Sequence, residues 1–152
     1  MRYFVYKVLD TKYEVPLLCY TTHMSQEEII KHWHMGAHDA LDVARLLAQN
    51  GKYALALFHC HLAIEKALKA VFILEKNKNP PLTHDLSALA EQLSSHWSEQ
   101  EEDLLDDLSG YSTAARYEDQ RWHEQKATKD NVEMWLRNTN LLFAKLDQFL
   151  HT

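Results

Sequence analysis

Apolar residues recur every three or four positions along most of this chain, the spacing that gathers them on one face of an α-helix. The first stripe follows Ser25, which has capping-box spacing with Glu28, and it stops at Asn50-Gly51, where both residues tolerate a left-handed cap. Its members are Ile29, Trp33, Ala37, Leu41, Ala44 and Ala48. The pattern predicts a first helix between these two signals.

The second predicted helix, from about Lys52 to Lys76, has an apolar arc wider than one neighbouring helix requires. One stripe consists of Tyr53, Leu57, Cys60, Ile64, Ala67, Val71 and Leu74. A second stripe beside it consists of Ala54, Phe58, His61, Glu65, Leu68 and Phe72. The residues expected towards the opposite side are Lys52, His59, Lys66, Lys69 and Lys76. Either this helix is central in a bundle, or its second stripe contacts a partner chain.

Capping signals place the remaining helices. Thr83 is the expected N-cap of a short helix that reaches about Leu93, and Ser98 with Glu101 repeats the capping-box spacing. Thr128 is the expected cap of the last helix. The apolar face of that helix is Val132, Trp135, Leu136, Thr139, Leu142, Phe143, Leu146 and Phe149. The sum is an all-α fold, an up-and-down bundle of four to five helices.

The bundle is expected to occupy residues 24–152 as one domain, which suits a chain of 152 residues with only 3 glycines and 3 prolines. Residues 1–23 differ, because Tyr3–Leu9 and Tyr13–Tyr20 are β-prone. This N-terminal extension is either a short β-hairpin or a leader, and the sequence does not separate the two.

Charge and cysteine usage narrow the classes of function. The net charge of −6 provides no global field for nucleic acid, so binding of RNA requires a local basic patch. Residues 99–107 are strongly acidic and are expected to form a solvated face. Cys19 and Cys60 have no metal-binding spacing and fit a reducing cytoplasm, with Cys60 a buried free thiol. No apolar run approaches the roughly 20 residues that cross a bilayer, so a cytoplasmic protein without a membrane partner is expected. No cofactor is expected either.

A polar, aromatic-rich segment from Tyr111 to Gln125 is expected as a loop between two helices, and residues 115–123 within it hold the candidate chemistry. The Arg116 guanidinium can grip a phosphate through two hydrogen bonds, and the His123 imidazole can take a proton from a ribose 2′-hydroxyl. Together they are sufficient in principle for RNA cleavage without a metal, with Arg116 stabilising the negative charge that develops on the phosphorane. The structural alternatives are an ion pair between Arg116 and Asp119 and a surface role for His123.

Further residues are weaker candidates. Tyr117, Asp119, Arg121 and, from the second helix, Glu65 are the candidate substrate-binding residues. Glu65 has the alternative of a buried, paired structural acid. Arg121 with Lys126 and Lys129 would form an auxiliary phosphate patch, which is diluted by the acidic residues Glu118, Asp119 and Glu124.

Two histidines have a spacing that can chelate zinc. His34 and His38 share one helix face at i,i+4. No carboxylate or cysteine is obviously placed in the sequence to complete such a site, so no metal site is predicted.

Four groups of residues, in this order, resemble the HEPN family over about residues 25–150. They are Trp33, Ala37 and Asp39; Phe58 with Glu65-Lys66-Ala67-Leu68-Lys69-Ala70; Thr83-His84-Asp85-Leu86; and Ala115-Arg116-Tyr117 with Asp119. The resemblance implies a helical bundle that commonly forms a homodimer. Many members are encoded beside a small nucleotidyltransferase, and a number are RNase toxins.

In those toxins the active residues are an arginine, four to six intervening residues and a histidine. Arg116 and His123 have six residues between them and meet this spacing. The resemblance implies that two protomers place both pairs in one cleft at the dimer interface, with RNA or a nucleotide as the ligand.

Tyr117 with Asp119 also resembles an arginine–tyrosine–proline–aspartate subgroup, with Glu118 in the place of the proline. For that subgroup the implied role is nucleotide binding or partnership with a nucleotidyltransferase. The second hypothesis is therefore a non-catalytic module that docks a nucleotidyltransferase.

Overall fold

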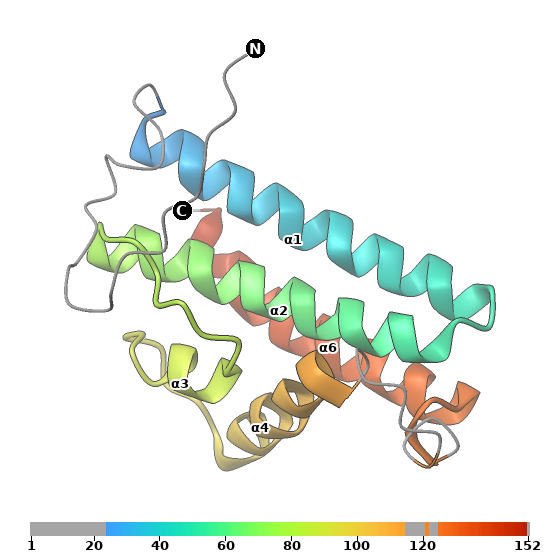
Figure 1. The fold of residues 1–152 in the computed structure, drawn as a ribbon. Coiled ribbons are helices and arrows are strands. Elements are labelled where there is room, and N and C mark those ends of the chain that lie inside the picture. Colours follow the sequence, from blue (N-terminus) through green and yellow to red (C-terminus); the bar gives the residue numbers. More distant parts are fainter. Residues whose placement is uncertain (1–23, 115–120, 122–124, 152) are drawn as a thin grey trace, which may run out of the picture.

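The computed structural model describes residues 24–114, 121 and 125–151. The helices described there are α1 (Gln26–Gln49), α2 (Tyr53–Lys76), α3 (Leu86–Ala90), α4 (Glu99–Ala114) and α6 (Lys129–Leu150). The four long helices alternate in direction along the chain, α1 and α4 opposite to α2 and α6 (Figure 1). The described part of the chain contains no strand, and the predicted all-α bundle is confirmed. The hairpin or leader considered for residues 1–23 lies outside the described residues.

Both ends of α1 follow the local signals in the sequence. The Glu28 backbone N–H donates to Ser25 Oγ at 3.2 Å, and the Ser25 N–H donates to the Glu28 carboxylate at 2.6 Å. This reciprocal capping box satisfies two backbone donors that the helix itself leaves open. At the other end Gly51 takes the left-handed conformation, with φ of 71°, whereas Asn50 does not. Gly51 therefore permits the sharp turn into α2.

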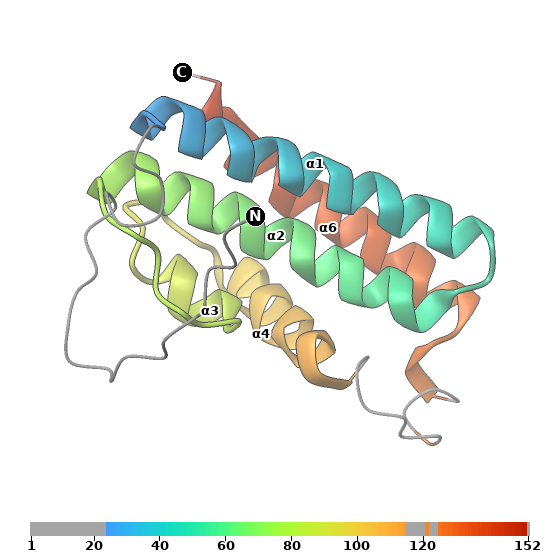
Figure 2. The ribbon, with the colours of Figure 1, turned by 45° about the horizontal axis from the view of Figure 1, so that its top comes forward.

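The central helix is α2, which contacts each of the other four described helices. The two views place α1 and α6 along α2, with α3 and α4 over another of its sides (Figures 1 and 2). This position explains its wide apolar arc, because Leu68 and Phe72 of the second stripe are buried within the single chain. Cys60 is buried and free, as predicted, and burial raises the pKa of its thiol to about 11.

Two residues of α2 were assigned to the wrong side. Lys69, expected towards solvent, is only 7% exposed, whereas Leu74, expected in the core, is 43% exposed. A sequence pattern places a lysine outside because of its charge. In the folded chain Lys69 is buried because Glu65, one turn earlier, neutralises it.

The predicted bounds of α3 and α4 also need correction. The N-cap of α3 is Asp85, whose carboxylate accepts from the Ala88 N–H at 3.0 Å, while Thr83 Oγ1 accepts from the Asp85 N–H. The helix stops at Ala90 rather than near Leu93. The helix α4 starts with the predicted Ser98–Glu101 capping box, but it continues to Ala114. Tyr111, expected in a segment between helices, is therefore helical and buried.

The last helix, α6, begins where the sequence predicted. Thr128 accepts a hydrogen bond from the Asn131 N–H at 3.3 Å. The buried residues of α6 are Val132, Trp135, Thr139, Leu142, Phe143 and Leu146. Within the described residues, no helix combines the length and apolar character needed to cross a membrane.

Candidate functional site

The candidate segment 115–123 lies between α4 and α6. Arg116, Tyr117, Asp119 and His123 lie outside the described residues, so the structure describes only what flanks them. Arg121 is described; it is helical and exposed. The helical backbone at Arg121 differs from the loop expected from the sequence.

Side chains from the first two turns of α6 hold both flanks of the segment. The Tyr111 ring, near the end of α4, meets the Trp135 ring edge-on at 5.3 Å between centroids. On the other flank, Asn131 Nδ2 donates to the Lys126 carbonyl at 2.7 Å. Burial raises the pKa of the Tyr111 phenol, which therefore stays protonated at neutral pH. A common anchor on α6 fixes the two ends from which the candidate segment extends.

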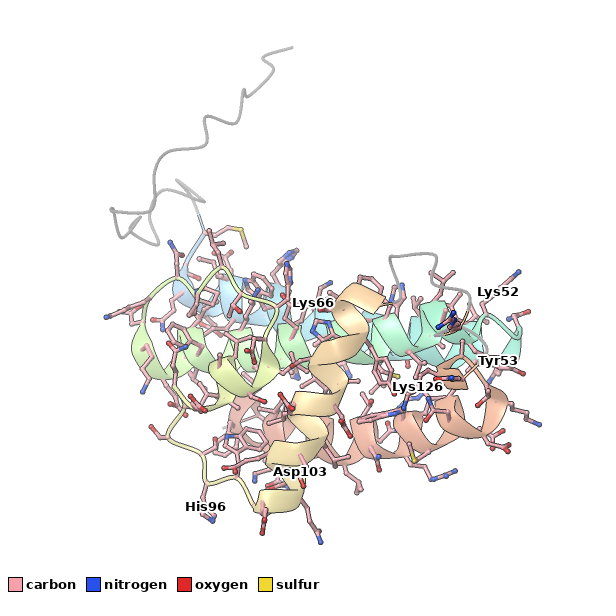
Figure 3. All side chains as sticks on the ribbon, turned by 60° about the horizontal axis from the view of Figure 1, so that its bottom comes forward. Lys52, Tyr53, Lys66, His96, Asp103 and Lys126 are labelled. Atoms are coloured by element: carbon pink, nitrogen blue, oxygen red, sulfur yellow. The ribbon has the colours of Figure 1, made fainter. Side chains whose placement is uncertain are left out.

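A shallow hollow of about 290 Å³ lies beside the flank that leads into α6. Its lining residues are Gly51, Lys52, Tyr53, Ala54, Leu55 and Ala127. Figure 3 shows Lys52 and Tyr53 at one end of the bundle, with Lys126 nearby. Lys52, which lines the hollow, is exposed, and so is Lys126, the chain neighbour of the lining residue Ala127. The predicted auxiliary patch is partly neutralised, because Lys129 Nζ lies 3.8 Å from the Glu133 carboxylate.

The opposite charge occupies α4. The exposed acidic residues of this helix are Glu99, Glu102, Asp103, Asp106 and Asp107. Glu101 is half-buried instead, because Lys145 Nζ of α6 donates to its carboxylate at 2.7 Å. The prediction of a solvated acidic face is confirmed. This face repels a phosphate backbone, so an anionic ligand is favoured at the end of the bundle that carries Lys52 and Lys126.

Glu65, the sixth candidate, lies in a polar cluster on α2. It is 5% exposed, and its carboxylate accepts from Lys69 Nζ at 2.6 Å and from His84 Nδ1 at 3.1 Å. His61 Nδ1 lies 3.7 Å from the same carboxylate, and His61 Nε2 bonds with the His84 carbonyl at 2.9 Å. This cluster ties the middle of α2 to the chain just before α3.

Electrostatics keep Glu65 ionised. Burial on its own raises the pKa of this carboxyl, but hydrogen bonds from Lys69 and His84, with the nearby positive charges, outweigh burial and hold the pKa below its usual value. Glu65 lies about 18 Å along α2 from Tyr53, at 1.5 Å per residue. Its contacts are those of a structural acid. The sequence did not reveal the contact with His84, since Thr83-His84-Asp85 was interpreted as a helix cap.

Comparison with known proteins identifies the family. The fold defines a small up-and-down helical-bundle protein, and the model of the HEPN domain matches residues 30–148. The chain belongs to the HEPN domain family. The matched range includes the whole segment 115–123. Comparison with the curated proteins gives no significant match.

Solved structures agree on the fold. The crystal structure of TT1696 from Thermus thermophilus is 22% identical, with a TM-score of 0.70, over 79% of this chain and 97% of that one. The crystal structure of ST0689, an archaeal HEPN homologue, is 18% identical, with a TM-score of 0.66, over 80% of this chain and 97% of that one. At these identities the likeness shows the shared fold alone.

Proposed function

We propose that this HEPN-domain protein acts on RNA as a metal-independent endoribonuclease of toxin type, with Arg116 and His123 as its catalytic residues. The observation that carries the proposal is the family match over residues 30–148, which includes an arginine and a histidine at the spacing of the family's RNases. The exposed Lys52 and Lys126 beside the hollow add support, because they provide positive charge at the flank of the same segment.

The proposed reaction uses the substrate's own nucleophile. His123 removes the proton of a ribose 2′-hydroxyl, and the resulting oxygen attacks the adjacent phosphorus. Arg116 stabilises the negative charge of the phosphorane. The bond to the 5′-oxygen breaks and this oxygen takes up a proton from water, which leaves a 2′,3′-cyclic phosphate on one fragment and a 5′-hydroxyl on the other. Tyr117, Asp119 and Arg121 would position the RNA.

Glu65 has an indirect role in this proposal. Among the proposed substrate-binding residues, Glu65 and Arg121 are the two within the described residues. The contacts of Glu65 with Lys69 and His84 favour an indirect role, in which it stabilises the bundle that carries the segment. A direct contact with substrate would require the buried Lys69 or the exposed His84 to be displaced from the Glu65 carboxylate.

The proposed active form is a homodimer. Leu55 of α2 is 49% exposed, and Ala54 and Phe58 beside it are only half-buried, so an apolar surface remains at the hollow. A second copy of the chain would cover this surface and bring both Arg116–His123 pairs into one cleft. We expect sedimentation at micromolar concentration to give twice the 17.8 kDa mass of one chain. Leu55→Asp should shift this mass towards the monomer, and a monomeric wild-type protein would contradict the dimer.

The test of the function is cleavage of a mixed-sequence RNA by the wild-type protein in EDTA. Fragments that end in 2′,3′-cyclic phosphate support the proposal. If the RNA stays intact under conditions where the protein is folded and dimeric, the endoribonuclease proposal is wrong.

The second candidate is a non-catalytic module that binds a nucleotide and docks a small nucleotidyltransferase. The sequence Arg116-Tyr117-Glu118-Asp119 favours this candidate, because it resembles the arginine–tyrosine–proline–aspartate subgroup. Saturable binding of RNA or ATP without cleavage, together with a stable complex with a co-expressed nucleotidyltransferase, would support it over the enzyme.

A further inference from the structure

Four side chains of types that can ligate a metal ion lie close together where α1 packs beside the C-terminal end of α6. His34 and His38 come from α1, Asp147 comes from α6, and His151 caps α6. Each helix therefore offers two ligands one turn apart, the spacing that lets one helix chelate a metal ion. The carboxylate that the sequence did not place beside His34 and His38 is Asp147, 113 residues from His34 along the chain.

Three of the ligand atoms, from His34, His38 and Asp147, already lie at nearly the separations of a tetrahedral site. His34 Nε2 and His38 Nε2 are 3.2 Å apart, and His38 Nε2 lies 3.4 Å from Asp147 Oδ1. Zinc–nitrogen bonds of about 2.05 Å in a tetrahedron put neighbouring ligand atoms about 3.3 Å apart. The Nε2 of His34 and the Oδ1 of Asp147, now 2.5 Å apart in a hydrogen bond, would separate by less than 1 Å.

The fourth ligand also has a suitable position. His151 Nε2 lies 3.1 Å from Asp147 Oδ2, and one ligand atom from each of His34, Asp147 and His151 lies within 4.8 Å of the others. His34 is only 14% exposed at its side chain, whereas His38 and His151 are 49% and 66% exposed. One ligand that is mostly covered and two that are accessible leave a route by which an ion can arrive from solvent.

We propose that His34, His38, Asp147 and His151 bind one Zn²⁺ ion that clamps α1 to the C-terminal end of α6. Three imidazoles and one carboxylate are donors that zinc accepts in tetrahedral sites, and this set favours zinc over the hard cations Mg²⁺ and Ca²⁺, which prefer oxygen ligands.

The ion would act on stability rather than on the RNA. Asp147 lies about 27 Å along α6 from Lys129, at 1.5 Å per residue, so the site is at the opposite end of this helix from the flank of the candidate segment (Figure 1). Binding of zinc to the folded chain alone raises the midpoint of thermal unfolding. The proposal is therefore independent of the nuclease, which is assayed in EDTA.

The experiment is a titration of untagged, metal-free protein with Zn²⁺, followed by calorimetry and by thermal unfolding. Co²⁺ in a parallel titration gives visible absorption bands whose intensity reports tetrahedral coordination. The variants are His34→Asn and Asp147→Asn. The matched control is His32→Asn, which changes an exposed histidine on the same helix, outside the cluster.

We expect one Zn²⁺ per chain and a tetrahedral Co²⁺ spectrum in the wild type and in His32→Asn. In His34→Asn and Asp147→Asn the affinity for Zn²⁺ should fall at least about 10-fold. Even changes to residues that only hydrogen-bond to the ligands cause a loss of this size, and loss of a ligand should cost no less. Absence of stoichiometric binding in the wild type would overturn the proposal. Binding that is equally tight in both ligand variants would also overturn it, because the ion would then lie elsewhere.

Discussion

Arg116→Ala and His123→Ala are each expected to lower the rate of RNA cleavage by about 10²–10⁴-fold. For His123 this is the range that a positioned general base contributes. For Arg116 the loss reflects the missing stabilisation of charge on the phosphorane. Arg116→Lys should recover only part of the rate, because an ammonium group keeps the charge but cannot make the bidentate contact.

The measurement is the initial rate of cleavage of one defined RNA in EDTA, with circular dichroism to show that each variant is folded. Arg137→Ala and His32→Ala are matched controls, since both residues are exposed on other parts of the bundle. Variants at Arg116 and His123 that cleave as fast as these controls would remove both residues from the proposed mechanism.

Glu65→Leu is expected to lower the free energy of unfolding by about 3–5 kcal/mol. The substitution removes the carboxylate that neutralises Lys69, and Lys69 is too deeply buried for water to replace it. Chemical denaturation followed by circular dichroism gives the difference. Glu133→Leu, which breaks the exposed pair with Lys129, should change stability by less than about 1 kcal/mol.

The double variant Glu65→Leu/Lys69→Met shows whether Glu65→Leu is unstable because Lys69 has lost its counterion or because the packing is disturbed. Removal of both charges should restore much of the stability lost in Glu65→Leu, because no buried charge is left without its counterion. If Glu65→Leu lowers the free energy of unfolding no more than Glu133→Leu does, the cluster of His61, Glu65, Lys69 and His84 does not stabilise the bundle as proposed.

The same cluster has a defined pH dependence. The pKa of Glu65 is lowered in the folded chain from its ordinary value of 4.5, so its contribution to stability is complete above that value. The contribution is lost as the pH falls through the lowered pKa. The difference in stability between wild type and Glu65→Leu should therefore narrow in acid.

Local signals in the sequence were sufficient to place most of the helices. The capping box at Ser25 and the cap at Thr128 set the starts of α1 and α6 correctly, because an N-cap hydrogen bond involves residues only three apart. The apolar periodicity predicted the bounds of α2 nearly to the residue, because it too depends on residues only three or four positions apart. The end of α4 was missed, since Tyr111 reads as polar and aromatic in sequence but packs against Trp135 of α6 in the fold.

Contacts between distant parts of the chain could not be predicted from the sequence. The burial of Lys69 depends on α2 being covered on several sides, and the contact of Glu65 with His84 depends on how the chain returns to α2 before α3. The approach of Asp147 to His34 depends on α6 lying beside α1. Periodicity says which face of a helix is apolar, but not which polar residue of another helix lies opposite.

Attack by the 2′-oxygen of the RNA itself can be tested with one pair of substrates. The pair is an RNA with a mapped cleavage position and the same RNA with a single 2′-deoxyribose immediately 5′ to that position, both incubated with the wild-type protein in EDTA. We expect unchanged binding and no cleavage at the deoxy position. Cleavage of both substrates at equal rates would show the proposed mechanism to be wrong, because the nucleophile would then be water rather than the ribose hydroxyl that His123 is proposed to activate.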